Sequence, residues 1–120
     1  MWRLKPKISM QKLGQTKTGS MNETEKTYAW ILEGKKERKE IIDYWYEKFK
    51  LRLADDCWYV VDFMVILPDG VMQIHEVKGE YIREDAIIKL KGIAEVFPFE
   101  VFMAQWKRKD KAFTITKVGR

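Results

Sequence analysis

The chain has 120 residues, of which 46% are hydrophobic and 34% are charged, and its formal net charge is +5 at neutral pH. This length suits one domain with its own core, and no linker or internal repeat divides it. A single cysteine, Cys57, excludes an internal disulfide; lacking a secretory signal or a membrane-length apolar run, the chain is expected to be a soluble cytoplasmic protein with no membrane partner.

The positive charge is concentrated at the N-terminus. Residues 1–20 contain five basic residues and no acidic one, and the other 18 basic residues balance the 18 acidic residues of 21–120. The first segment is rich in Gly, Ser, Thr and Gln and has no helical or strand period, which predicts a flexible arm before a domain at 21–120. Such an arm could contact nucleic-acid phosphates or be a solvated terminus. Its candidate phosphate contacts are Lys5, Lys7, Lys12 and Lys17.

The domain is expected to begin with a helix over residues 22–33. Asn22 suits the N-cap position, and Glu25, three residues later, suits the reciprocal position of a capping box. Gly34 is expected to end the helix. At 100° per residue Glu25 shares a stripe with Tyr28, so the glutamate lies on the face that should pack on a sheet. Glu25 is therefore a candidate helix cap and a candidate site residue.

The central part of the chain is expected to form three strands. Alternating apolar residues predict one strand over 41–54 and a hairpin of two strands over 58–67 and 71–78. Pro68 and Gly70 suit a three-residue turn that closes with a G1 bulge. Both hairpin strands are apolar on each face, which predicts central strands covered by helices.

A second helix over 83–97, ended by Pro98, is followed by strands over 99–106 and 112–118. The order of helix, three strands, helix and two strands predicts an α/β (α+β) fold with a central mixed sheet flanked by helices. Basic residues of the second helix could approach a substrate phosphate or form a solvated face; these are Arg83, Lys89 and Lys91.

The hairpin brings three ionisable residues together. If facing residues are symmetric about Asp69, Asp62 lies opposite Glu76, and alternation puts Lys78 on the same face as Glu76. Facing carboxylates repel each other, and hard cations such as Mg²⁺ or Mn²⁺ prefer carboxylate oxygens. The pattern suits metal-assisted phosphodiester hydrolysis, and equally an ion-pair cluster at a strand end. A slip of one residue would separate the two acids, and His75 is expected to face away from Asp62.

These residues, in this order of elements, resemble the PD-(D/E)XK nuclease superfamily, whose restriction-endonuclease-like core runs αβββαβ. The resemblance implies that Asp62 and Glu76 hold a Mg²⁺ or Mn²⁺ ion and that the carbonyl of Val77 joins them. It also implies that Lys78 is a catalytic lysine and that Glu25 is the additional acid of the first helix.

The resemblance is closer to a group of short phage-encoded proteins of this superfamily, thought to be recombination or junction nucleases. The similar stretches are 21–29, 50–55, 75–79, 84–86 and Pro98-Phe99. In one departure, Val61 stands where the superfamily has a proline, which removes no ligand. The resemblance implies a homodimer that cleaves branched DNA such as Holliday junctions in the cytoplasm of a bacterial host cell.

Two other function classes fit the same sequence. One is a non-catalytic nucleic-acid-binding module that keeps a nuclease-like fold and contacts phosphates through its basic arm. The other is an interaction protein that recruits a partner through the arm, for which the sequence contains no positive feature. Aromatic residues that could stack on unpaired bases, or simply pack a strand, are Tyr44, Trp45 and Tyr46.

Overall fold

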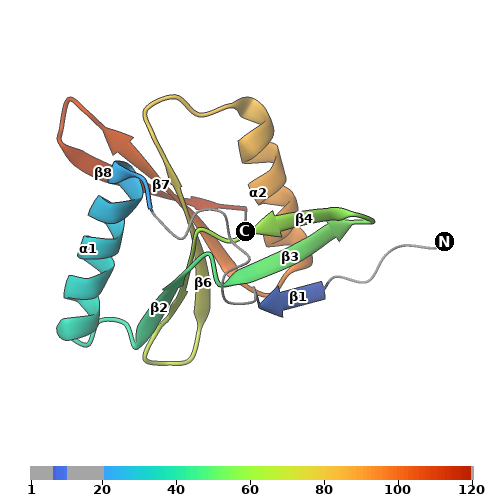
Figure 1. Ribbon diagram of the computed structural model, residues 1–120, viewed down its shortest axis with the longest axis horizontal. Coiled ribbons are helices and arrows are strands. Elements are labelled where there is room, and N and C mark those ends of the chain that lie inside the picture. Colours follow the sequence, from blue (N-terminus) through green and yellow to red (C-terminus); the bar gives the residue numbers. More distant parts are fainter. Residues whose placement is uncertain (1–6, 11–20, 120) are drawn as a thin grey trace.

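The computed structural model describes residues 7–10 and 21–119, and Figure 1 shows how their elements are arranged. The described residues form two helices and eight strands. In chain order these are β1 (Lys7–Met10), α1 (Glu23–Glu37), β2 (Asp43–Tyr46), β3 (Phe49–Ala54), β4 (Cys57–Val60), β5 (Phe63–Ile66), β6 (Met72–Lys78), α2 (Glu84–Val96), β7 (Glu100–Lys107) and β8 (Ala112–Val118).

The strands form two sheets. The larger has the order β2-β5-β6-β7-β8 and is mixed, because β6 and β7 are parallel whereas the other neighbours are antiparallel. The smaller has the order β1-β3-β4 and is antiparallel. The predicted α/β class with a mixed sheet is confirmed.

The helices cover opposite faces of the larger sheet. Along β5, Phe63 belongs to the apolar cluster that contains Tyr28 and Leu32 of α1. The next residue, Met64, belongs to the cluster that contains Leu90 of α2. Because side chains alternate along a strand, the two helices lie on the two sides of β5, and the predicted flanking helices are confirmed.

Two of the predicted strands are each divided between the sheets. The predicted strand 41–54 is β2 and β3, which break at Glu47 and Lys48, and the predicted strand 58–67 is β4 and β5, which break at Val61 and Asp62. β2 pairs with β5 in the larger sheet and β3 with β4 in the smaller. Both strands therefore pass from one sheet to the other together, at a place called the corner here and defined by residues 47–48 and 61–62.

Backbone hydrogen bonds tie the two halves of the corner together. The N–H of Glu47 donates to the carbonyl of Asp62 at 2.9 Å, and the N–H of Val61 donates to the carbonyl of Phe49 at 2.9 Å. Glu47 has a φ of 47°, in the left-handed region that non-glycine residues rarely adopt. The prediction of two uninterrupted strands was wrong because apolar alternation continues through this bend.

The predicted hairpin is confirmed in its register and its turn. Met64 faces Ile74, so facing residues are symmetric about Asp69, and the N–H of Leu67 donates to the carbonyl of Val71 at 2.8 Å. Gly70 has a φ of 90°, the conformation that the turn requires. Extended by one step beyond the ladder, this register places Asp62 opposite Glu76.

The helix boundaries differ from prediction at one end. α1 continues through Gly34 to Glu37, and the N–H of Arg38 donates to the carbonyl of Gly34. A glycine inside a helix costs only about 1 kcal/mol relative to alanine, and the lysines that follow it suit the C-terminal end of the helix dipole. Lys39, two residues after the last residue of α1, has a φ of 63°. This left-handed residue ends the helix, a role that was expected of Gly34.

The segment 1–20, for which no strand was expected, contains one. Residues 7–10 form β1, in which Lys7 faces Arg52 of β3. The other basic residues singled out in this segment, Lys5, Lys12 and Lys17, lie outside the described residues. Within the described part of the chain, neither helix has the length and apolar character that a membrane span needs.

Candidate functional site

Asp62 lies at the corner, between the last residue of β4 and the first residue of β5. Its Oδ2 accepts a hydrogen bond from the backbone N–H of Val77 at 3.0 Å. Burial raises the pKa of Asp62 to about 8, assisted by the charges of Glu76 and Glu25, and opposed by the Val77 bond and by Lys78. The predicted group of Asp62, Glu76 and Lys78 is thus electrostatically connected, and Glu25 belongs to it.

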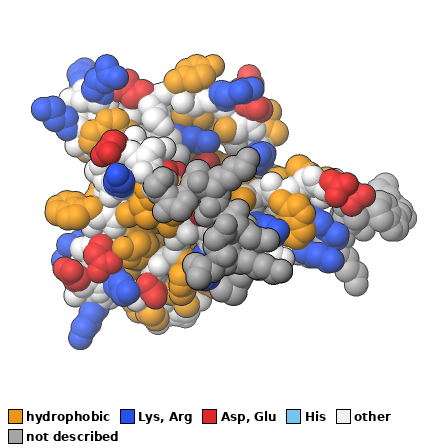
Figure 2. Space-filling view, in the orientation of Figure 1, with side chains coloured by type: hydrophobic (Ala, Val, Ile, Leu, Met, Phe, Trp, Pro, Cys, Tyr) orange, Lys and Arg blue, Asp and Glu red, His pale blue; other side chains and the backbone are white. Residues whose placement is uncertain are grey.

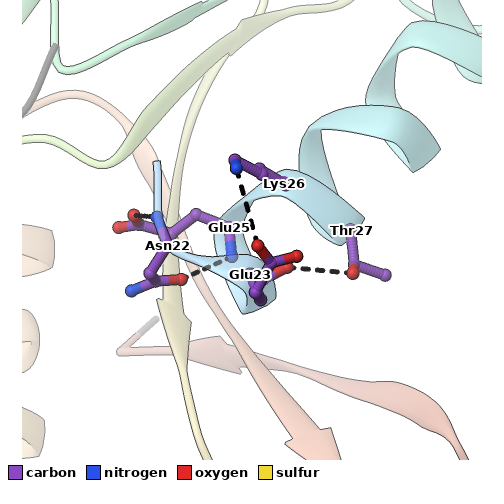
Figure 3. Close-up of polar contacts among 5 residues, drawn as sticks. All are labelled: Asn22, Glu23, Glu25, Lys26 and Thr27. Atoms are coloured by element: carbon purple, nitrogen blue, oxygen red, sulfur yellow. Dashed lines mark hydrogen bonds and ion pairs between the residues drawn. The ribbon is translucent and has the colours of Figure 1, made fainter. Parts of the chain in front are cut away.

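Glu25 is placed by the first turn of α1. Its Oε1 accepts from the backbone N–H of Asn22 at 3.0 Å, while its own N–H donates to Asn22 Oδ1 at 2.8 Å. Figure 3 shows this reciprocal capping box, which confirms the predicted cap. The same Oε1 also accepts from the hydroxyl of Tyr46 at 2.9 Å. Capping and a position at the site are therefore compatible roles of one side chain.

Glu47 is a site residue that the sequence reasoning missed. Carboxylate oxygens of Glu25, Glu47 and Asp62 all lie within 4.8 Å of one another. A signal for Glu47 was present in the sequence, because it occupies an apolar position of the alternation between Trp45 and Phe49. A charged residue at an apolar position of a strand indicates a special role, as it does for Asp62.

The three carboxylates supply the oxygen ligands that a hard divalent cation prefers. Mg²⁺ binds oxygen ligands at about 2.1 Å, so oxygens on its opposite sides are about 4.2 Å apart. The backbone carbonyl of Val77 is a further candidate ligand, since the N–H and C=O of one strand residue point to the same side and this N–H reaches Asp62. Glu25, Glu47 and Asp62 therefore fit a Mg²⁺ or Mn²⁺ ion, with Val77 beside them.

Glu76 is held on the α2 side of the sheet. Its Oε1 accepts from the hydroxyl of Tyr59, and its Oε2 lies 3.0 Å from Nζ of Lys78. Burial and the charges of Glu76 and Asp62 raise the pKa of Tyr59, which keeps its hydroxyl protonated as a donor. Tyr59 is the second site residue that sequence reasoning missed, because the sequence of an apolar strand does not show which group a tyrosine hydroxyl contacts.

A cavity of about 160 Å³ adjoins Glu76 and Lys78, and Arg83 and Lys89 also line it. Nζ of Lys89 lies 5.9 Å from the ring centroid of Tyr59. Of the three predicted phosphate contacts on α2, Arg83 and Lys89 therefore lie at the site, whereas Lys91 does not line this cavity. Asp85 also lines the cavity and lies 3.2 Å from Nε of Arg83, so the lining holds acidic as well as basic groups. Lys89 and Arg83 could contact a phosphate-bearing ligand there.

His75 faces the α1 side, as predicted. Its Nδ1 is hydrogen-bonded to the hydroxyl of Tyr28, and its Nε2 lies 2.9 Å from the side-chain oxygen of Gln73. Burial lowers the pKa of His75 to about 4, so the ring is neutral at neutral pH. His75 is a packed residue with both ring nitrogens in use, on the opposite side of β6 from Glu76.

The aromatic residues of β2 pack within the core. The ring centroids of Tyr44 and Tyr46 lie 6.4 Å and 5.3 Å from that of Phe63, and Trp45 lies 5.9 Å from Phe49. Of the two expectations for these residues, the contacts favour packing over base stacking.

No protein-family model, curated protein or solved structure matches this chain. The resemblance to PD-(D/E)XK nucleases accordingly depends on the residues named above.

Proposed function

We propose that the protein is a metal-dependent endonuclease that hydrolyses phosphodiester bonds in DNA with Mg²⁺ or Mn²⁺. The observation that supports this proposal is the position of Asp62 at the corner, with Glu25 and Glu47 within 4.8 Å on one side and the Glu76 to Lys78 pair on the other. Acidic oxygens beside a lysine are the groups that hydrolysis of a phosphodiester needs.

Each side chain has a role in this proposal. Glu25, Glu47 and Asp62, with the carbonyl of Val77, would hold the metal, whereas the resemblance implies Asp62, Glu76 and Val77 as its ligands. The metal would supply positive charge to the phosphoryl group and make water a better nucleophile at neutral pH. Lys78, positioned by Glu76, orients the attacking water and offsets the negative charge that develops on the phosphoryl oxygens. Glu76 in turn is oriented by Tyr59, whose hydroxyl occupies one of its oxygens.

The substrate class in this proposal is branched DNA, such as a Holliday junction, cleaved by a homodimer. This finer proposal depends on the resemblance to phage-encoded junction nucleases. The basic side chains of Arg83 and Lys89 beside the site support a nucleic-acid substrate in general, because both can contact backbone phosphates.

The test is cleavage of a supercoiled plasmid and of a four-way junction, each with Mg²⁺, Mn²⁺ or EDTA. We expect cleavage in both metals and none in EDTA, with symmetric nicks in the junction. Asp62→Asn and Lys78→Ala should remove cleavage and retain DNA binding. Asp69→Asn makes the same chemical change as Asp62→Asn in the exposed hairpin turn, so it is the matched control and should cleave normally.

Unchanged cleavage in both Asp62→Asn and Lys78→Ala would refute the assignment. DNA binding by the wild-type protein without turnover in either metal would support the alternative of a non-catalytic nucleic-acid-binding module.

A further inference from the structure

The smaller sheet has one apolar face and one basic face. It projects beside α2 in Figure 1, and Leu51 and Tyr59 of its inner face are buried in the cluster that contains Leu90 of α2. The alternate residues of β3, Lys50 and Arg52, point to the opposite side. This opposite side is called the outer face below.

Cross-strand register defines the outer face as two rows that run over all three strands. The first row is Lys7, Arg52 and Trp58, and the second is Ser9, Lys50 and Val60. Directly facing residues of an antiparallel pair share a side of the sheet, so these six residues lie together. Three of the six are cationic and none is acidic. Figure 2 shows Lys and Arg side chains gathered where Figure 1 places β3 and β4.

The charges of Lys7 and Lys50 on this face are not paired with acidic side chains of the described residues. Among the described residues neither Lys7 nor Lys50 forms an ion pair, and Nζ of Lys50 instead lies 4.8 Å from the ring centroid of Trp58. A cation over an aromatic ring keeps its full charge. By contrast, Lys117 of β8 is paired with Glu100 at 3.5 Å. The outer face therefore presents charge that a polyanion can use.

The rows lead to the candidate site. The hydrogen bond from the N–H of Val61 to the carbonyl of Phe49 continues the β3 to β4 register, so the next row after Lys50 and Val60 is Lys48 and Asp62. Successive rows are about 7 Å apart, which places the Trp58 row about 13 Å from Asp62 along β4. This distance corresponds to about four nucleotides of one strand of a DNA duplex.

We propose that the outer face of the β1-β3-β4 sheet, through Lys7 and Lys50, binds the phosphate backbone of the DNA strand that continues from the Asp62 site. A nucleic acid fits this face better than a neutral partner does, because the face is a continuous cationic strip that ends at the acidic corner. That the bound strand leads to Asp62 rests on the proposed nuclease function, whereas binding itself does not.

Binding is tested by fluorescence anisotropy with a labelled DNA duplex and a labelled four-way junction, in EDTA, over about 50 to 200 mM NaCl. The variant is Lys7→Ala with Lys50→Ala, which spares the partly buried Arg52. The matched control, Lys107→Ala with Lys109→Ala, removes the same charge from the β7 to β8 hairpin, at two lysines that form no ion pair among the described residues. Circular dichroism and thermal melting of both variants are the checks that they are folded.

The outer-face variant should bind more weakly, by about tenfold at the lowest salt, and the slope of log Kd against log salt should fall by about 2. The control should change neither quantity to that extent. Equal changes in the two variants, or no change in the outer-face variant, would overturn the proposal.

Cleavage of the junction in Mg²⁺ separates this proposal from the proposed function. The outer-face variant should show a raised KM with kcat retained, since Lys7 and Lys50 would contact the bound strand and not the reacting phosphate. A wild-type protein that does not cleave, but whose binding falls in the outer-face variant, would refute the nuclease and retain the binding face. If the wild-type protein cleaves and the outer-face variant binds DNA as tightly as wild type, the binding face is refuted and the nuclease is retained.

Discussion

The two sides of the corner hold their carboxylates in different ways. On the α2 side, Glu76 has a built-in cation and a donor, because Lys78 lies 3.0 Å from one oxygen and the Tyr59 hydroxyl occupies the other. On the other side of the corner, called the Glu25 side here, Glu25, Glu47 and Asp62 place three carboxylates within 4.8 Å of one another. One side receives a cation from the chain, and on the other the acidic groups repel one another when they ionise.

The two sides therefore differ in whether they need an added cation. Like charges in a partly buried place repel, and burial raises the pKa of Asp62 to about 8 together with the charges of Glu76 and Glu25. An external divalent cation would relieve this repulsion on the Glu25 side. The α2 side does not need one, and its lysine is available to the substrate.

The largest expected effect is the loss of cleavage on substitution of Asp62 or Lys78, and the response to Mn²⁺ distinguishes the two residues. Each of Asp62→Asn and Lys78→Ala should lower cleavage by about a thousandfold or more. Only Asp62→Asn should also abolish the rise in melting temperature that Mn²⁺ produces, because a bound ligand stabilises the folded state by about 2.7 kcal/mol at a hundred times its Kd. Melting scans with and without Mn²⁺ measure this difference. Loss of the rise in Lys78→Ala would show that the two sides act as one.

The second prediction concerns stability against pH in EDTA. The pKa of Asp62 is about 8 in the folded chain and about 3.9 when unfolded. Its contribution to stability is therefore complete below about pH 4 and is lost as the pH rises toward 8. Asp62→Asn keeps an acceptor for the Val77 N–H and removes the charge. Relative to wild type, the free energy of unfolding of this variant should therefore rise by up to about 5 kcal/mol between about pH 4.5 and pH 8.5.

Urea denaturation at several pH values between these limits measures the difference, with Asp69→Asn as the control that should follow wild type. Parallel pH curves for Asp62→Asn and wild type would contradict the repulsion inferred for the Glu25 side.

The third prediction tests the support of Glu76. Tyr59→Phe removes the hydroxyl from Glu76, and Tyr28→Phe removes the hydroxyl from His75 on the other face. Each should cost about 1 to 2 kcal/mol in unfolding free energy. Only Tyr59→Phe should lower kcat/KM for DNA cleavage, by about thirtyfold, as loss of a group that orients a site residue does. Similar activities in the two variants would leave Tyr59 a purely structural residue.

The smallest effect is expected for Glu47. Glu47→Gln keeps the size of the side chain and removes one of three negative charges, so Mn²⁺ should bind about fivefold more weakly. Isothermal titration of the metal into each variant gives the affinity. Glu37→Gln, at the exposed end of α1, is the control with the same chemical change. Unchanged Mn²⁺ affinity in Glu47→Gln would exclude Glu47 from the site.

Local chemistry made much of the site predictable. The Pro68 to Gly70 turn determines the register of its hairpin, and the register determines that Asp62 is opposite Glu76 and that Lys78 shares the face of Glu76. The capping box of Asn22 and Glu25 likewise involves residues three apart, so it could be predicted from the sequence. The class of the fold followed from the order of helical and strand periods.

The passage of both long strands from one sheet to the other at the corner could not be predicted in the same way. Alternation along 41–54 and 58–67 reports which side chains are buried, and it does not report which sheet buries them. Where β2 becomes β3 and β4 becomes β5 depends on partners far away in the chain, including β1, which has no strand signal of its own. The position of the Tyr59 hydroxyl on Glu76 depends on the same change of sheet at the corner.

The sequence by itself therefore determined the hairpin, the helix cap and the pairing of Asp62 with Glu76, because each depends on residues a few positions apart or joined by one turn. Only the tertiary structure decided that both long strands bend at the corner and that Glu47 joins Glu25 and Asp62 there. It also decided that the basic outer face leads to the same place. These features arise from pairing between distant segments, for which alternating hydrophobicity carries no register.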